Sequence, residues 1–242
     1  MRSPLRRGFT LIELLTVIAI IGILTAVLIP AAMGVQKRAR VANSQTALAS
    51  WASGCVRYKQ AYGFFPVLST GTVSTTADEM RKLESGTSPT TNVGCYLVMS
   101  LSGRTPNGSA LPTAGTVNPR MRFNRNSEAF VEFSREDYED FTKLPTGTDT
   151  AGSIGTGNFL VDRLGNRNIR LVLDYNNSGS LRLTSGAPAT AAMPLDVRPL
   201  ATTGIPGRVL IYTSKTDVTS VDITTAAEGT ERSDYADIIS IQ

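Results

Sequence analysis

The amino-acid sequence contains no histidine among its 242 residues. Histidine-based catalytic triads and most zinc enzymes are therefore excluded. The sequence also lacks a phosphate loop of the G-x-x-x-x-G-K-[ST] type, a G-x-S-x-G nucleophile turn and an H-E-x-x-H zinc motif. Because no catalytic constellation is present in the sequence, we expect a protein that is not an enzyme and that requires no cofactor.

The excess of positive charge is small and comes mostly from one place. The chain has 24 basic and 20 acidic side chains, a formal net charge of +4. Three of the basic residues, Arg2, Arg6 and Arg7, lie among the first eight positions; without them 21 basic side chains face 20 acidic ones. This balance gives no support for nucleic-acid binding.

Charge is scarce in the segment that follows. Residues 9–29 form a run of 21 residues whose one charged side chain is Glu13. A helix of ~20 apolar residues spans the core of a bilayer, so the run predicts a membrane-spanning helix. A carboxylate within such a helix costs on the order of 2.5–3.5 kcal/mol. Glu13 is therefore either hydrated near the lipid headgroups or paired with a buried cation.

Cleavage of the chain would supply that cation. A cut after Gly8 gives Phe9 a new α-amine, which is largely protonated at neutral pH. In a neighbouring subunit shifted along the helix axis, this amine would meet Glu13 directly. A paired buried charge is tolerable where a lone one is costly. Such a pair would fix the stagger between subunits of an assembly.

The residues around this junction are Arg6-Arg7-Gly8-Phe9-Thr10-Leu11-Ile12-Glu13. They resemble the leader and cleavage junction of the type IV pilin and type II secretion pseudopilin superfamily. Pro30 falls where that family often breaks its long N-terminal helix. The resemblance implies that a prepilin peptidase cuts after Gly8 and methylates Phe9, and that Glu13 is the assembly carboxylate.

The same resemblance implies an organisation in three parts. Residues 1–8 would be the leader and residues 9–30 the transmembrane and polymerisation helix. Residues 31–242 would be an extracytoplasmic, pilin-like globular domain that includes the second half of the long helix. Basic residues flank both ends of the apolar run and do not settle its orientation. The family instead implies a single-pass protein of the bacterial inner membrane, with the C-terminal domain in the periplasm.

The family also implies the partners. They are the prepilin peptidase, the inner-membrane assembly platform, membrane lipid, further copies of this chain and other pseudopilins. In the oxidising periplasm Cys55 and Cys95 would either form a disulfide or remain two buried thiols.

Beyond Pro30 the pattern becomes amphipathic. Pro30 should kink or locally melt the helix. Apolar residues then recur at helical spacing on one face, which we expect to pack on the chain's own domain; they are Val41, Leu48, Trp51, Cys55, Tyr58 and Tyr62. Gly63 would end this helix. Residues 58–66 (YKQAYGFFP) resemble the Y-x-x-x-x-G-x-x-P segment of major pseudopilins.

Short helices are predicted in the middle of the chain. They cover residues 77–84, residues 92–102 as a buried helix, and residues 135–141, where Ser134 would cap the first turn. For residues 92–102 a strand is the alternative, because the segment contains valines and a tyrosine. Five acidic residues lie between Glu132 and Asp140. We interpret them as a solvated polar helix, since no metal-ligand spacing is kept.

From residue 158 the pattern favours strands. Strands are expected at 159–162, 169–175, 181–183, 208–213 and 237–241, joined by turns at 165–166 and 176–179. Short sequential strands with tight turns predict an antiparallel sheet packed on the helix. The predicted fold class is therefore α+β: a long N-terminal helix and a C-terminal antiparallel sheet.

Two C-terminal segments extend the resemblance. Residues 162–166 (DRLGN), followed by Tyr175, resemble the D-P-W-G-N…Y strand-turn-strand of major pseudopilins, with Arg163 and Leu164 in place of the usual Pro and Trp. Residues 211–217 (IYTSKTD) are similar to that family's S-x-G-x-D segment. Major pseudopilins hold calcium in this loop. Calcium takes six to eight oxygen ligands; Asp217, Asp222 and Asp234 are the candidates here.

The C-terminal similarities favour a structural subunit of a type II secretion pseudopilus, which drives protein export. A type IV pilin serving adhesion, motility or DNA uptake is the alternative. A membrane-anchored extracytoplasmic enzyme is the alternative from a different class.

Overall fold

A computed structural model describes residues 11–68, 78–83, 93–113, 119–139, 160–167, 169–181, 204–213 and 239–241. Its contacts divide the chain into two compact units, Met1–Ala42 and Asn43–Gln242. Each unit is considered by itself below, and we call the second unit the head. The expected boundary near residue 30 stays a prediction.

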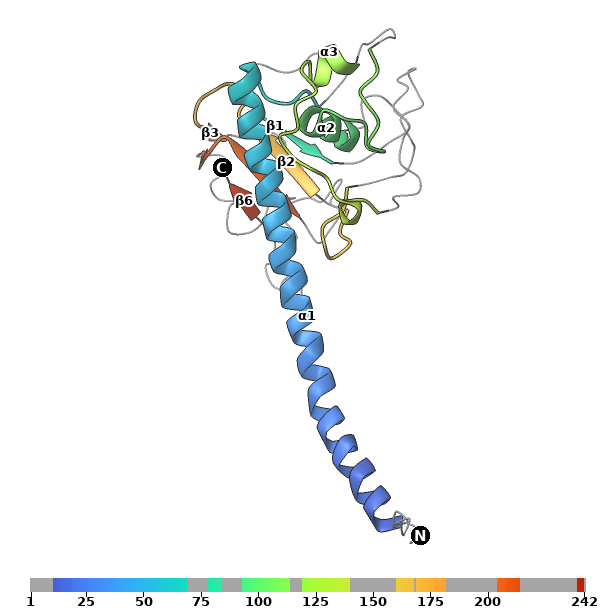
Figure 1. Ribbon diagram of the computed structural model, residues 1–242. Helices are drawn as coiled ribbons and strands as arrows, with labels where there is room; N and C mark the ends of the chain where they lie inside the picture. Colours follow the sequence, from blue (N-terminus) through green and yellow to red (C-terminus); the bar gives the residue numbers. More distant parts are fainter. Residues whose placement is uncertain are drawn as a thin grey trace. The chain divides into compact units, whose positions relative to one another are not determined.

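The first element is the long helix α1, Leu11–Tyr62 (Figure 1). The helix is continuous through Pro30, so the expected local melting is wrong. A proline removes one amide donor, here the bond to the Ala26 carbonyl, and the hydrogen bonds on either side keep the helix intact. A bend at Pro30 stays a prediction. Gly63 ends the helix as expected, with φ of 82° and its N–H donated to the Lys59 carbonyl at 2.8 Å.

The head contains a four-stranded sheet in the order β1-β2-β5-β6, with antiparallel pairing throughout (Figure 1). Its strands are β1 Glu79–Lys82, β2 Ile169–Leu173, β5 Val209–Thr213 and β6 Ile239–Ile241. A second, two-stranded sheet pairs β3 Ser180–Leu181 with β4 Ile205–Pro206. A long N-terminal helix with an antiparallel sheet confirms the predicted α+β class.

The predicted strands are present but shorter. β2 stops at Leu173, where a turn opens at Asp174, and β5 starts at Val209. Of the strand expected at 159–162, Leu160 forms only an isolated bridge with Tyr138. The remaining expected ends, at 159, 182–183 and 237–238, lie outside the described residues. Every residue of β2 and β5 is buried, which accounts for their continuous apolar sequences.

The helix predicted at 77–84 is wrong where the structure describes it. Residues 79–82 form strand β1, and Glu79 pairs with Leu173. The sequence of this segment favours a helix, but the ladder to β2 satisfies its backbone groups and overrides that weak preference.

The described part of the head also contains three short helices: α2 Val93–Ser102, α3 Pro119–Phe123 and the 3₁₀ helix η1 Arg135–Asp137. α2 confirms the buried helix predicted at 92–102. η1 has the predicted Ser134 capping box, but the predicted helix is reduced to one turn because Tyr138 is extended at φ −115° and ψ 142°. Residues 140–141 lie outside the described part.

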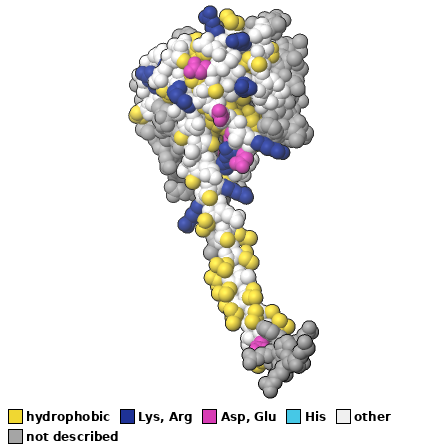
Figure 2. All heavy atoms as spheres, in the orientation of Figure 1, with side chains coloured by type: hydrophobic (Ala, Val, Ile, Leu, Met, Phe, Trp, Pro, Cys, Tyr) yellow, Lys and Arg dark blue, Asp and Glu magenta, His cyan; other side chains and the backbone are white. Residues whose placement is uncertain are grey.

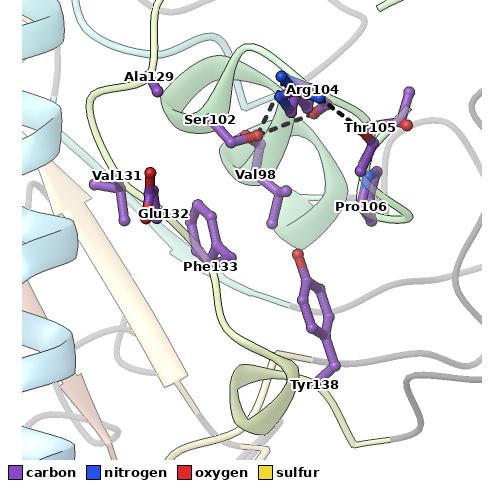
Figure 3. Close-up of a pocket in the computed structure, with 11 residues that line it drawn as sticks. Val98, Ser102, Arg104, Thr105, Pro106, Ala129, Val131, Glu132, Phe133 and Tyr138 are labelled. Carbon is purple, nitrogen blue, oxygen red and sulfur yellow. Dashed lines mark hydrogen bonds between the residues drawn. The ribbon is translucent and has the colours of Figure 1, made fainter. Parts of the chain in front are cut away.

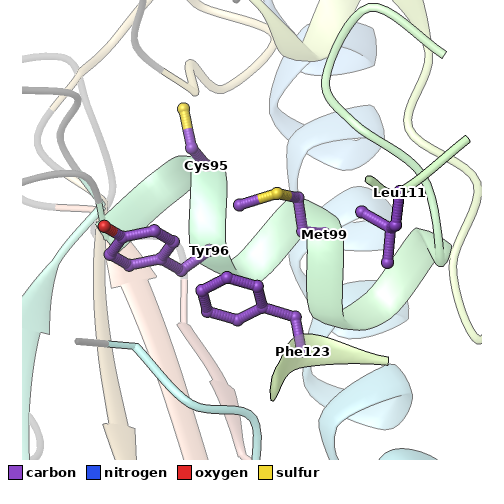
Figure 4. Close-up of a cluster of buried hydrophobic side chains, with 5 residues drawn as sticks. All are labelled: Cys95, Tyr96, Met99, Leu111 and Phe123. Carbon is purple, nitrogen blue, oxygen red and sulfur yellow. The ribbon is translucent and has the colours of Figure 1, made fainter. Parts of the chain in front are cut away.

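Aromatic packing joins α1, α2 and α3. Tyr96 and Phe123 stack with ring centroids 4.8 Å apart, within a cluster that includes Cys95, Met99 and Leu111 (Figure 4). The Tyr58 hydroxyl of α1 donates to the Phe123 carbonyl at 2.5 Å. The predicted buried face of α1 is confirmed, since Leu48, Trp51, Cys55 and Tyr58 are buried.

Candidate functional site: the apolar N-terminal helix

The first part of α1 exposes an unusual amount of apolar surface. Its large apolar side chains, from Leu11 to Val35, are each between 46% and 81% exposed. Figure 2 shows them along the visible face of this segment. Soluble single chains rarely expose apolar patches larger than a few hundred Å². This surface therefore requires an apolar environment outside its own chain.

Length and composition agree with a membrane. Among the described residues, α1 is the one helix long and apolar enough to cross a bilayer, with a mean hydropathy of 2.7 in its most apolar window. Two hydroxyl side chains in its apolar part, those of Thr16 and Thr25, bond within the helix. Thr16 Oγ1 donates to the Glu13 carbonyl at 3.0 Å, and Thr25 Oγ1 donates to the Ile21 carbonyl at 2.8 Å. Internal bonding of this kind suits a helix without water around it.

Glu13 lies in the first turn of α1, where the amide groups of a helix present partial positive charge. Its position next to the start of the helix would bring it near an α-amine formed at Phe9. Gly8 and Phe9 lie outside the described residues, so the expected cut and the pairing stay predictions.

Two further candidate residues, the cysteines, lie in the head. Cys55, on α1, and Cys95, on α2, have buried thiols that form no disulfide. Burial raises the pKa of the Cys55 thiol, which keeps it protonated. Asp217, Asp222 and Asp234 lie outside the described residues. Within the part of the chain that is described, no three His, Cys, Asp or Glu side chains gather as a metal site.

The turn at 162–166 forms as the resemblance implies. The Asp162 carboxylate accepts the N–H groups of Leu164 and Asn166, both at 2.8 Å, and Gly165 has φ of 82°. The two pseudopilin-like segments also meet, since the Tyr175 hydroxyl donates to the Pro66 carbonyl at 3.3 Å. Sequence reasoning placed these segments in the family but did not predict their contact.

Arg163 has a role that the usual proline could not take. Its backbone N–H donates to the buried Ser44 Oγ of α1 at 2.9 Å. Its guanidinium pairs with Asp137 at 3.0 Å and with Glu136 at 3.3 Å. Arg163 thus joins η1, the turn at 162–166 and α1. The sequence signal that could have found it is this departure from the family pattern.

Comparison with known proteins agrees with the geometry of α1. Residues 4–29 match the model of the prokaryotic N-terminal methylation motif. The chain is 36% identical over 79 residues to the type IV major pilin protein PilE1 of Neisseria gonorrhoeae, covering 33% of this chain and 37% of the pilin. It is 38% identical over 79 residues to a fimbrial protein of Neisseria meningitidis serogroup B, covering 33% of this chain and 46% of that protein.

A third relative comes from another bacterium. The chain is 46% identical over 56 residues to the type IV wide pilus major component PilA4 of Thermus thermophilus, covering 23% of this chain and 40% of that protein. The chain thus matches less than half the length of each of these relatives. No solved structure matches the chain.

A long apolar N-terminal helix joined to an α+β head defines a class of membrane-anchored, single-pass proteins with a pilin-like fold. The methylation motif and the pilin relatives support the type IV prepilin and pseudopilin superfamily.

Proposed function

We propose that this protein is a structural subunit of a membrane-derived filament. The observation that carries the proposal is the apolar part of α1, residues 11–35, whose exposed side chains surround the helix. A bilayer covers such a surface while the subunit is a monomer, and the same part of neighbouring subunits covers it in a filament. The leader of residues 1–8 is removed by a prepilin peptidase, and the head lies in the periplasm until an inner-membrane platform adds the subunit to the filament.

Glu13 sets the stagger between subunits. After cleavage, the Phe9 amine and the Glu13 carboxylate are the charges within the buried apolar stretch. In the monomer Glu13 lies near the membrane surface and is hydrated. In the filament it meets the amine of a neighbour, so that neither charge is buried alone.

Two kinds of filament have separate support. The relatives reported above are pilus and fimbrial proteins by name, which supports a type IV pilus subunit. The sequences of residues 58–66 and 162–175 resemble segments of major pseudopilins, and in this chain the two segments meet through Tyr175 and Pro66. This resemblance supports a subunit of type II secretion that drives protein export. Deleting the gene separates them: loss of surface fibres indicates the pilus, and retention of exported proteins in the periplasm indicates secretion.

The central test replaces Glu13 in cells that carry the full machinery. Removing one member of a buried ion pair costs about 3–5 kcal/mol. Glu13→Val should therefore insert and be cleaved normally, yet yield far fewer filaments; Glu13→Asp should fall between. Filaments are sheared and pelleted, membrane levels are measured separately, and intact mass reports loss of residues 1–8 and one methyl group on Phe9.

The matched control is Leu14→Val, which changes a neighbouring side chain without touching charge. If Glu13→Val assembles as well as Leu14→Val at equal membrane abundance, the pairing is wrong. If the wild-type protein keeps residues 1–8 in its filaments, the processing step is wrong.

A further inference from the structure

The head contains a preformed pocket of about 380 Å³ between α2 and residues 129–138 (Figure 3). Val98, Pro106, Phe133 and the ring of Tyr138 give it an apolar wall. Phe133 is held from behind by Trp51 of α1, with ring centroids 5.3 Å apart. The pocket therefore has the size and the fixed wall needed to receive one large apolar side chain.

The rim of the pocket carries an exposed acidic group. The Glu132 carboxylate is exposed and forms no salt bridge with the described residues. The other charged lining residue, Arg104, donates to the Gly108 carbonyl at 3.1 Å. Figure 3 shows Glu132 next to Val131, to one side of Val98, and Arg104 above Val98 near Ser102. One side of the rim is thus acidic and available to a basic partner.

A complementary group lies on α3. In the described part of the head, the large apolar side chains that are exposed are Met121, at 60%, and Phe64, at 49%. Phe64 already rests on the rings of Tyr58 and Tyr62, at 5.9 and 6.2 Å. Met121 is more exposed, and a flexible thioether adapts to an irregular pocket.

The surroundings of Met121 are basic. Arg120 and Arg122 flank it, and Arg125 is exposed and forms no salt bridge within the described residues. α3 is fixed to the core, because Phe123 stacks on Tyr96 and its carbonyl accepts the Tyr58 hydroxyl. Met121 is therefore presented on a rigid, positively charged support.

We propose that Met121 of one subunit enters the pocket of the next subunit, with Arg125 facing Glu132 across the contact. The occupant is a second copy of this chain because the head itself carries both a basic, exposed apolar group and a pocket with an acidic side to its rim. Two different patches that bind each other make a head-to-tail contact, and repetition of such a contact builds an open helical filament when the rotation between subunits does not close into a ring. This inference rests on the proposed filament and adds a contact between heads to the packing of the apolar helices.

Crosslinking tests the contact directly. Subunits with Met121→Cys are expressed together with subunits with Ala129→Cys, and sheared filaments are treated with a short bifunctional maleimide. Both positions are exposed, so the substitutions should leave the head folded, and the native Cys55 and Cys95 are buried. The mixture should give crosslinked dimers well above the yield of either variant alone, because only the mixture places a cysteine on both sides of the contact.

The matched control pairs Phe64→Cys with Ala129→Cys. This control tests another exposed apolar position of the head against the same pocket. It should give no dimer above background. Equal dimer yields from the Phe64 and Met121 mixtures, in filaments that form normally, would overturn the proposed contact. Absence of filaments from the wild-type chain would instead remove the proposed function.

Charge reversal supplies a second, independent test. Glu132→Lys and Arg125→Glu should each reduce the Met121–Ala129 crosslink several-fold, because each brings like charges together at the rim. The two reversals combined should restore the crosslink. A double variant no better than the worse single variant would show that these two charges do not face each other.

Discussion

The two parts of α1 obtain their stability in opposite ways. Apart from Glu13, residues 11–35 present apolar side chains around the helix, and each large apolar side chain is 46% or more exposed. Leu48, Trp51, Cys55 and Tyr58, by contrast, are at most 2% exposed. The second part is amphipathic, with a polar face toward solvent and one buried apolar stripe. A single surface inside the same chain is therefore enough to cover its apolar side chains. The first part needs apolar surroundings on all sides. One continuous helix thus combines a segment that needs an apolar environment outside the chain with a segment that packs inside the head.

The largest expected difference comes from deleting one large side chain in each part. Trp51→Ala should lower the free energy of unfolding of the head by about 3–5 kcal/mol, because it leaves a cavity beside Phe133. Leu24→Ala removes a side chain that is 55% exposed and should leave that free energy unchanged. Calorimetry of the full-length protein in detergent micelles measures both. Equal losses would mean that the apolar part also supports the head.

Glycine-to-alanine substitutions compare the two parts of α1 by adding one methyl group in each. A Cβ at Gly54 would lie 2.2 Å from Val131 Cγ2, so Gly54→Ala overpacks the head and should cost about 1–3 kcal/mol. A Cβ at Gly22 or Gly34 meets nothing within 4 Å. Gly22→Ala and Gly34→Ala should therefore keep the wild-type unfolding temperature. A loss at Gly34 as large as that at Gly54 would contradict the division of the helix.

The smallest effect concerns pH and belongs to the head. Burial raises the pKa of Asp162, although hydrogen bonds from Asn166, Leu164 and Gly165 oppose the shift. Between the ordinary value of 3.8 and the raised value, the folded state binds more protons than the unfolded state. Stability from this group therefore rises as pH falls through that window, by at most about 1.4 kcal/mol per pH unit.

Asp162→Asn removes this proton while retaining an oxygen to accept the turn's N–H groups. Wild type should gain stability relative to the variant when the pH is lowered through the window. Denaturant unfolding of the full-length chain in micelles at several pH values measures the difference. A constant difference between the two proteins would show that Asp162 does not take up the proton.

The sequence predicted the elements whose signal is local. The uniform apolar run, the stripe ending at Tyr62 and the apolar segment of α2 each dictate their own structure, and the turn at Gly165 requires a positive φ. β1 could not be predicted, because its strand form depends on β2 some ninety positions away. β4 contains Pro206 and α3 begins with Pro119, and both prolines read as loop in the sequence.

The functional residues likewise divide into those that local sequence predicts and those that only the fold brings together. The junction from Arg6 to Glu13 is contiguous, so its chemistry could be predicted from order alone. The pocket beside Tyr138 is assembled from α2 and a segment thirty residues later, and no local pattern records their approach. The pairing of Arg163 with Asp137 depends in the same way on two distant turns.

The hydrogen bond from Arg163 to Ser44 limits how this head can exchange parts with its relatives. A turn taken from a major pseudopilin would bring proline to position 163 and remove the N–H that reaches the buried Ser44 hydroxyl. Leaving a buried polar group without its partner costs about 1–3 kcal/mol. A chimera that exchanges this turn must therefore exchange residue 44 as well. The two positions, 119 apart in the chain, have to be matched to each other.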